Sequence, residues 1–211
     1  MRKGGDGRTY LISRAVLCMF AAVLLLLPLN KNSGMRLRRR LAAPGAVAAI
    51  LTVFSLFPPE VAFLSFSSPP EAFAYNNIGQ IELTVTGEES ALIAAHSGDH
   101  DTIRIVAKAG ERWKAGIGLD TKTVSHKVAD GVVITVYRYR STNEYYVSLS
   151  NTNGGVLDIT DIGGADLQHT ERDNAVLQER FYTYYFYARD LTADRTVSID
   201  GKTVRLWDDP E

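Results

Sequence analysis

From residue 80 onward, apolar and polar residues alternate with a period of two, which is typical of β-strands. The clearest strand is expected at residues 132–139, where apolar or aromatic side chains stand on both faces. A strand with two apolar faces is covered on both sides, so we expect it at the centre of the fold. Further strands are predicted at residues 80–86, 103–108, 123–128, 145–149, 156–160, 180–188, 195–199 and 202–207.

Short polar segments join two pairs of these strands as hairpins. Asp200-Gly201 separates the last two predicted strands, and Asp-Gly readily adopts the two positive φ angles of a type I′ turn. The Ser-Thr-Asn segment at residues 141–143 separates another pair in the same way. Strands joined by such short turns are antiparallel, so we expect an antiparallel arrangement.

Two short helices are expected to interrupt the strands. One is predicted at residues 88–95, and the other at residues 170–179, where Thr170 and Asp173 have the spacing of a helix-capping pair. We therefore predict a mainly β fold for residues 75–211. Its expected form is an antiparallel sandwich or open barrel of about seven to nine strands with one or two short helices.

The first 60 residues have a different pattern, with two uncharged apolar runs at residues 15–29 and 41–57. Each run is shorter than the roughly 20 residues that cross a bilayer upright, although both approach the lower limit. The arginines between the runs are Arg36, Arg38, Arg39 and Arg40. This arrangement predicts an apolar targeting or anchor region ahead of the β-rich domain.

Met35 divides this N-terminal region in two. A chain read from Met35 opens with basic residues followed by an apolar run, as an export signal does. Ala72 and Ala74 then form an A-x-A pattern, which predicts cleavage before Tyr75. We therefore expect three parts. Residues 1–34 form an upstream apolar extension, which is either an extra helix or sequence ahead of the true start. Residues 35–74 form a signal peptide or an uncleaved membrane anchor, and residues 75–211 form a β-rich domain.

Charge divides the chain at the same place. Residues 1–74 hold nine Lys/Arg against three Asp/Glu, a net charge of +6, whereas residues 75–211 hold fourteen against twenty-one, a net charge of −7. An acidic domain repels the phosphate backbone, so nucleic acid is not an expected partner. The single cysteine, Cys18, lies in the basic part, so the acidic domain has neither a disulfide nor a thiolate ligand.

Tyrosine is concentrated in one part of the domain, because eight of the ten tyrosines lie between residues 137 and 187. On an exposed sheet face, tyrosine rings stack on sugars or anchor a protein partner, whereas buried tyrosines pack as cross-strand pairs. Alternate side chains of residues 180–188 point to opposite faces, and we expect only one of these faces to belong to the core. The candidate ligand-binding residues are Tyr137, Tyr139, Tyr145, Tyr182 and Tyr184.

A six-residue segment provides a candidate metal site. Its members are His96, Asp99, His100 and Asp101, whose imidazole and carboxylate groups suit zinc or a similar ion. Gly98 interrupts any helix that would align the two histidines, and a polar loop between two elements has the same composition. No cofactor other than this metal is predicted.

The sequence contains none of the short motifs of nucleophilic hydrolases, phosphate-binding loops, dinucleotide-binding proteins or zinc proteases. We therefore expect an exported or membrane-tethered, non-enzymatic binding or accessory domain in the cell envelope, which holds a glycan or an envelope protein through its Tyr-rich face or its loops. Its expected location is periplasmic or extracellular, or membrane-anchored with residues 75–211 outside the cytoplasm. Two alternatives stay open: an exported hydrolase with a carboxylate pair or a metal, and a membrane-anchored structural subunit.

Overall fold

The computed structural model describes residues 63–98, 100–115, 121–140, 142–174 and 179–207. Within these residues the chain forms antiparallel sheets and a short helix, so the prediction of a mainly β, antiparallel fold is confirmed. No helix in these ranges is long and apolar enough to cross a membrane. The apolar runs at residues 15–29 and 41–57 lie outside the described residues.

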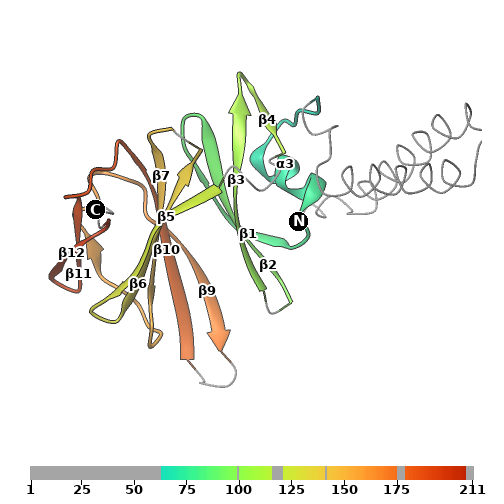
Figure 1. The fold of residues 1–211 in the computed structure, drawn as a ribbon. Coiled ribbons are helices and arrows are strands. Elements are labelled where there is room, and N and C mark those ends of the chain that lie inside the picture. The colour runs from blue at the N-terminus through green and yellow to red at the C-terminus, as the bar shows by residue number, and fades with distance from the viewer. Residues whose placement is uncertain (1–62, 99, 116–120, 141, 175–178, 208–211) are drawn as a thin grey trace, which may run out of the picture.

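The described strands are arranged in three sheets (Figure 1). The N-terminal sheet has the order β1 (Gln80–Thr86), β2 (Ser90–Ser97), β3 (His100–Ala109) and β4 (Arg112–Lys114). The central sheet has the order β5 (Thr121–Ala129), β6 (Val132–Tyr139), β7 (Glu144–Asn151), β10 (Glu179–Arg189) and β9 (Gln168–Asn174). The C-terminal sheet has the order β12 (Lys202–Arg205), β11 (Thr196–Ile199) and β8 (Ile159–Thr160).

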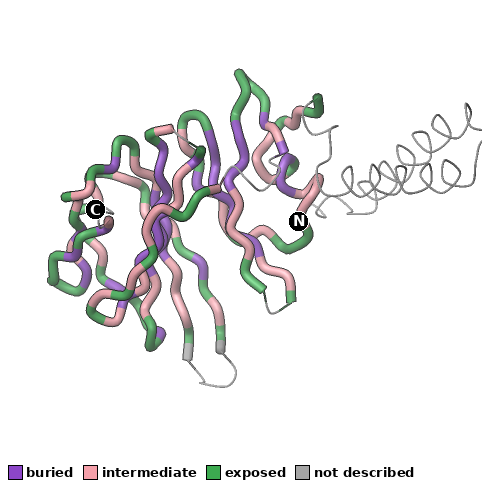
Figure 2. Tube along the Cα trace, in the orientation of Figure 1, coloured by how far each residue is buried: buried purple, intermediate pink, exposed green. Residues whose placement is uncertain are grey.

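The central sheet is covered on both faces. One face packs against the C-terminal sheet through residues such as Ile134 and Val136 of β6. The other face packs against the N-terminal sheet, where Tyr139 of β6 meets a cluster that contains Leu92 of β2. The sheets accordingly lie side by side in Figure 1, and the buried residues follow the strands through the interior in Figure 2. The prediction of a central strand at residues 132–139 with two buried faces is confirmed.

Helix α3 (Pro69–Asn76) covers the outer face of the N-terminal sheet. Ser68 caps the helix, because its hydroxyl accepts a hydrogen bond from the backbone N–H of Glu71 at 3.4 Å. Phe73 is fully buried in a third apolar cluster, which includes Ile93 of β2 and Trp113 of β4. The described residues thus form four layers in the order α3, N-terminal sheet, central sheet and C-terminal sheet (Figure 1).

Both helix predictions are wrong. Residues 88–95 form a turn and then most of β2, in which Ser90 to Ala95 are all buried. A short run that is buried on both faces has no period that distinguishes a strand from a helix. Residues 168–174 form β9, because their backbone pairs with β10 as a hairpin. Residues 175–178, which complete the second predicted helix, lie outside the described residues.

Candidate functional site

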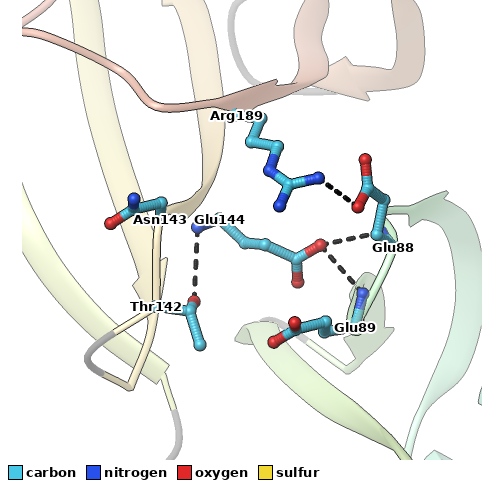
Figure 3. A pocket seen from close by; sticks show the side chains of 6 residues that line it. All are labelled: Glu88, Glu89, Thr142, Asn143, Glu144 and Arg189. Carbon is cyan, nitrogen blue, oxygen red and sulfur yellow. Dashed lines mark hydrogen bonds and ion pairs between the residues drawn. The ribbon is translucent and has the colours of Figure 1, made fainter. Parts of the chain in front are cut away.

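A polar cleft opens where the N-terminal and central sheets meet. It lies between the β1–β2 turn, the segment before β7 and the end of β10, and it has a volume of about 320 Å³. Its lining is polar or charged and consists of Glu88, Glu89, Thr142, Asn143, Glu144 and Arg189 (Figure 3). Because both sheets contribute to the lining, the shape of the cleft depends on how the sheets are joined.

The Glu144 carboxylate joins the two sheets beside the cleft (Figure 3). Glu144 begins β7, and only 4% of the residue is exposed. Its Oε1 atom accepts hydrogen bonds from the backbone N–H groups of Glu88 at 2.7 Å and Glu89 at 2.9 Å, and from the Tyr187 hydroxyl at 3.0 Å. Its Oε2 atom accepts a hydrogen bond from the Ser90 hydroxyl at 2.5 Å. A buried carboxylate requires such donors, and here they come from both sheets.

Two tyrosine hydroxyls complete this network. The Tyr146 hydroxyl lies 2.8 Å from the Ser90 hydroxyl and donates to it, because Ser90 uses its own hydrogen on Glu144. Burial and the nearby Glu144 charge raise the pKa of Tyr146 above its ordinary value. Burial and the hydrogen bond to Glu144 raise the pKa of Tyr187 to about 12. Both tyrosines are therefore neutral near pH 7 and act as hydrogen-bond donors.

Gly87, at the start of the β1–β2 turn, lies against this network. A Cβ atom at this position would lie 2.7 Å from both the Tyr146 hydroxyl oxygen and the Cε2 atom of Tyr187, and 2.9 Å from Glu144 Oε1. The backbone N–H of Gly87 donates to the Ser90 carbonyl at 2.8 Å, which fixes the turn. Only a glycine allows the turn to approach the central sheet this closely.

The rim of the cleft carries groups that are exposed to solvent. Arg189 forms an ion pair with Glu88. The Asn143 side-chain amide donates to Asp190 Oδ1 at 2.7 Å, which fixes its orientation. Glu89 is exposed, and its backbone N–H is bound to Glu144. Amide, guanidinium and carboxylate groups therefore stand close together within reach of a ligand.

Two members of the predicted metal site, His96 and Asp101, form part of a second junction between the sheets. His96 Nδ1 lies 3.0 Å from Asp101 Oδ1 on the neighbouring strand. Asp101 also pairs with Arg172 of β9, which binds Glu82 of β1 at 2.9 Å. Burial alone raises the pKa of Asp101, but hydrogen bonds from Arg172 and His96 outweigh it and lower that pKa below its ordinary value. This ion cluster holds β9 of the central sheet against the N-terminal sheet.

The remaining members of the predicted metal site do not join this cluster in the described structure. His100 is exposed at the start of β3, and Asp99 lies outside the described residues. Within the part of the chain that the structure describes, no three His, Cys, Asp or Glu side chains are grouped to hold a metal ion. The Arg172 guanidinium provides the positive charge next to Asp101. The full metal site stays a prediction.

The five candidate tyrosines lie on strands of the central sheet. Tyr139, Tyr145 and Tyr184 are buried, with 6%, 6% and 7% of each residue exposed, whereas Tyr137 and Tyr182 are half-buried. Their ligand-binding role stays a prediction. All five, however, lie in or against the apolar clusters between the sheets, which agrees with the alternative that these tyrosines are packing residues.

The expectation that only one face of residues 180–188 belongs to a core is wrong. Tyr184 and Phe186 of β10 pack in the cluster between the central and C-terminal sheets. Tyr185 packs in the cluster between the central and N-terminal sheets. Because the central sheet is covered on both faces, each face of β10 contributes buried aromatic side chains.

Neither Glu144 nor the cleft is predicted from the sequence. The local signal is weak, because a charged residue at the start of an apolar strand is typical of an ordinary strand end. The groups that bind Glu144 from the β1–β2 turn and β2 lie 54 to 56 positions earlier in the chain. The sequence pattern also predicts a helix at residues 88–95, where the structure has the turn and strand that supply these groups.

Comparison with known proteins gives no assignment. No family model matches the chain, and neither a curated protein nor a solved structure is significantly similar to it. The function is therefore inferred from the chemistry of the cleft.

Proposed function

We propose that this chain is an exported or membrane-tethered, non-enzymatic binding domain of the cell envelope, and that the polar cleft holds its ligand. The observation that carries the proposal is the environment of Glu144. Its carboxylate accepts four hydrogen bonds from the protein while only 4% of the residue is exposed. The buried acidic group of the cleft is thus used to join the two sheets and to keep the cleft in shape.

One observation favours the alternative of a hydrolase, because the carboxylates of Glu88, Glu89 and Glu144 all line the cleft. A general acid or base, however, must come within hydrogen-bond distance of the substrate. Glu144 is enclosed by its own donors, and Glu88 is paired with Arg189. With these two carboxylates engaged, the cleft does not present two free carboxylates on opposite sides of a glycosidic bond, as a glycoside hydrolase requires. Binding is therefore better supported than hydrolysis.

The rim of the cleft supports a hydroxyl-rich ligand, such as a glycan. Glu89, Asn143 and Arg189 are exposed and present a carboxylate, an amide and a guanidinium group. Sugar hydroxyls both donate and accept hydrogen bonds, so one glycan can pair with all three groups. A cleft whose walls are already fixed loses little conformational entropy when a ligand binds.

The N-terminal region supports a location in the envelope. Residues 1–74 combine two apolar runs with a net charge of +6, as export signals and membrane anchors do.

Separate antiparallel sheets that pack face to face also support a sandwich rather than an open barrel. Sandwich domains commonly carry their binding groups on the loops at the ends of the sheets, which is where the cleft lies.

The proposal is tested by calorimetric titration of the full chain with oligosaccharides released from a cell envelope. Arg189→Gln removes the guanidinium from the cleft, and we expect it to weaken binding about tenfold or more. Arg180→Gln is the matched control, because Arg180 is also an exposed, ion-paired arginine of β10 but lies outside the cleft. Binding that both variants weaken equally, or no saturable binding to any oligosaccharide, would contradict the proposal.

A further inference from the structure

The alanines that predict cleavage before Tyr75 lie inside a folded part of the chain. We propose that the mature protein retains residues 66–74, and that any removal of the N-terminal region ends before Phe66. Retention of these residues is independent of which ligand the cleft binds. Three sets of contacts support it: a backbone bridge, a buried helix and the apolar sheet face beneath that helix.

Phe66 extends the N-terminal sheet at its β4 edge. Its backbone N–H donates to the Trp113 carbonyl at 2.8 Å, and the Trp113 N–H donates to the Phe66 carbonyl at 2.9 Å. The Arg112 side chain also donates to the Ser65 carbonyl at 3.1 Å. Reciprocal backbone hydrogen bonds of this kind are those of an antiparallel strand pair. The segment ahead of α3 is therefore part of the sheet's hydrogen-bonded edge.

Helix α3 continues this contact as an apolar cover. Ala72 and Phe73 are both fully buried against the sheet. Phe66 lies ahead of the helix and Tyr75 lies in its last turn, and the centroids of their aromatic rings are 5.4 Å apart. At the end of the helix, the backbone N–H and the side-chain amide of Asn77 both donate to the Phe73 carbonyl, at 3.1 and 3.0 Å. The helix is thus packed and capped as an integral element of the domain.

Cleavage between Ala74 and Tyr75 would leave one face of the N-terminal sheet bare. It would remove Phe66 and Phe73, whose side chains cover that face. The buried side chains beneath them are Ala91, Ile93, Ala95, Val106 and Trp113. A contiguous apolar sheet face in contact with water promotes aggregation. The domain that starts at Tyr75 is therefore not a stable unit.

The small side chain of Ala72 has a structural explanation that does not involve a peptidase. Ala72 has no exposed surface and lies against the sheet, where a larger side chain would have to displace its neighbours. A small residue at this position is thus required by packing. The first alanine of the A-x-A pattern, Ala72, lies on the buried face of α3, and the second, Ala74, is half-buried in the same helix.

The test is the N-terminal peptide of the protein, produced from the full-length gene with a C-terminal tag in an exporting cell and analysed by mass spectrometry. We expect a first residue at or before Phe66. The variant Ala74→Gln places a large side chain where a signal peptidase requires a small one. We expect this variant to start at the same residue as the wild type. A wild-type start at any later residue, or a longer form that accumulates only in the variant, would overturn the proposal.

A second measurement compares Phe73, in the retained segment, with Phe63, which lies ahead of that segment. Phe73 is fully buried, whereas Phe63 is 85% exposed, so Phe63→Ala is a matched control for Phe73→Ala. If the mature protein retains α3, Phe73→Ala lowers the melting temperature by several degrees and Phe63→Ala leaves it unchanged. Equal melting temperatures for the two variants and the wild type would show that α3 is absent from the mature protein.

Discussion

The Ser90 hydroxyl lies 2.5 Å from the Glu144 carboxylate, and this contact joins the N-terminal sheet to the centre of the fold. Ser90 begins β2, Glu144 begins β7, and the two residues are 54 positions apart in the chain. Both are buried, with 0% and 4% exposed. Hydrogen bonds to a charged acceptor contribute more than those between neutral groups. The position of the β1–β2 turn, and with it the shape of the cleft, therefore depends on this pair.

The first prediction concerns Glu144→Gln. The variant keeps the shape of the side chain but replaces one carboxylate oxygen with an NH₂ group, which then faces hydrogen-bond donors. We expect the free energy of unfolding to fall by about 3 kcal/mol, because buried donors lose a charged acceptor. Urea unfolding followed by circular dichroism measures this change.

The control for this variant is Glu111→Gln. Glu111 is exposed in the turn between β3 and β4, so the same chemical change there is expected to alter stability by less than about 0.5 kcal/mol. A loss of similar size in both variants would show that net charge, rather than the Glu144 hydrogen bonds, determines the result.

The second prediction concerns Gly87→Ala. The new Cβ would lie 2.7 Å from the Tyr146 hydroxyl oxygen, so the β1–β2 turn must move away from the central sheet. We expect a loss of about 2 kcal/mol in stability. Gly98→Ala provides the comparison, because Gly98 has a φ angle of +61° but open space around it. Backbone strain alone is expected to cost about 1 kcal/mol there, and a smaller loss at Gly87 than at Gly98 would contradict the close approach.

The third prediction concerns stability in acid. The pKa of Asp101 is lower in the folded protein than its ordinary value of 3.8, so its ion cluster stabilises the fold above that pH and is lost as the pH falls through the lowered pKa. The stability difference between the wild type and Asp101→Asn is therefore expected to shrink as the pH falls below about 4. Chemical unfolding at a series of pH values measures it. A difference that does not change with pH would show that Arg172 and His96 do not stabilise the charged form.

The fourth prediction concerns stability in alkali. The pKa of Tyr187 rises from 10.0 to about 12 on folding. Between these two pH values the folded state keeps the hydroxyl proton, whereas the unfolded state loses it. The stabilisation is complete below pH 10 and is lost as the pH rises towards 12. Tyr146 adds a second contribution of the same sign. We expect Tyr187→Phe to lose stability less steeply between pH 10 and 12 than the wild type, and an equal slope would contradict the raised pKa.

The sequence predicts the parts of the fold that have a local pattern. The sequence predicts β6 with its correct bounds, because Val132, Ile134 and Val136 alternate with residues that suit the opposite face. The Asp200-Gly201 hairpin also follows from local turn chemistry, and both residues have positive φ angles in the structure. Such elements are determined by neighbours in the sequence, so no knowledge of the tertiary structure is required.

The remaining elements depend on contacts between distant residues. β2 has no polar face because α3 covers one side and the central sheet covers the other, and its sequence therefore has no strand period. α3 lies in a segment whose small residues also resemble a cleavage site. Glu144 is recognised as a special residue only when its donors in the β1–β2 turn are known. Local sequence patterns do not contain this information.

The most direct test of the binding cleft is to incubate the full chain with envelope oligosaccharides, measure saturable binding by calorimetry and weigh the recovered sugars by mass spectrometry. We expect saturable binding and sugars of unchanged mass, because Glu144 is enclosed by its own hydrogen-bond donors. Shortened sugars would identify a hydrolase instead, and a lack of saturable binding would contradict the assignment of the cleft as a glycan site.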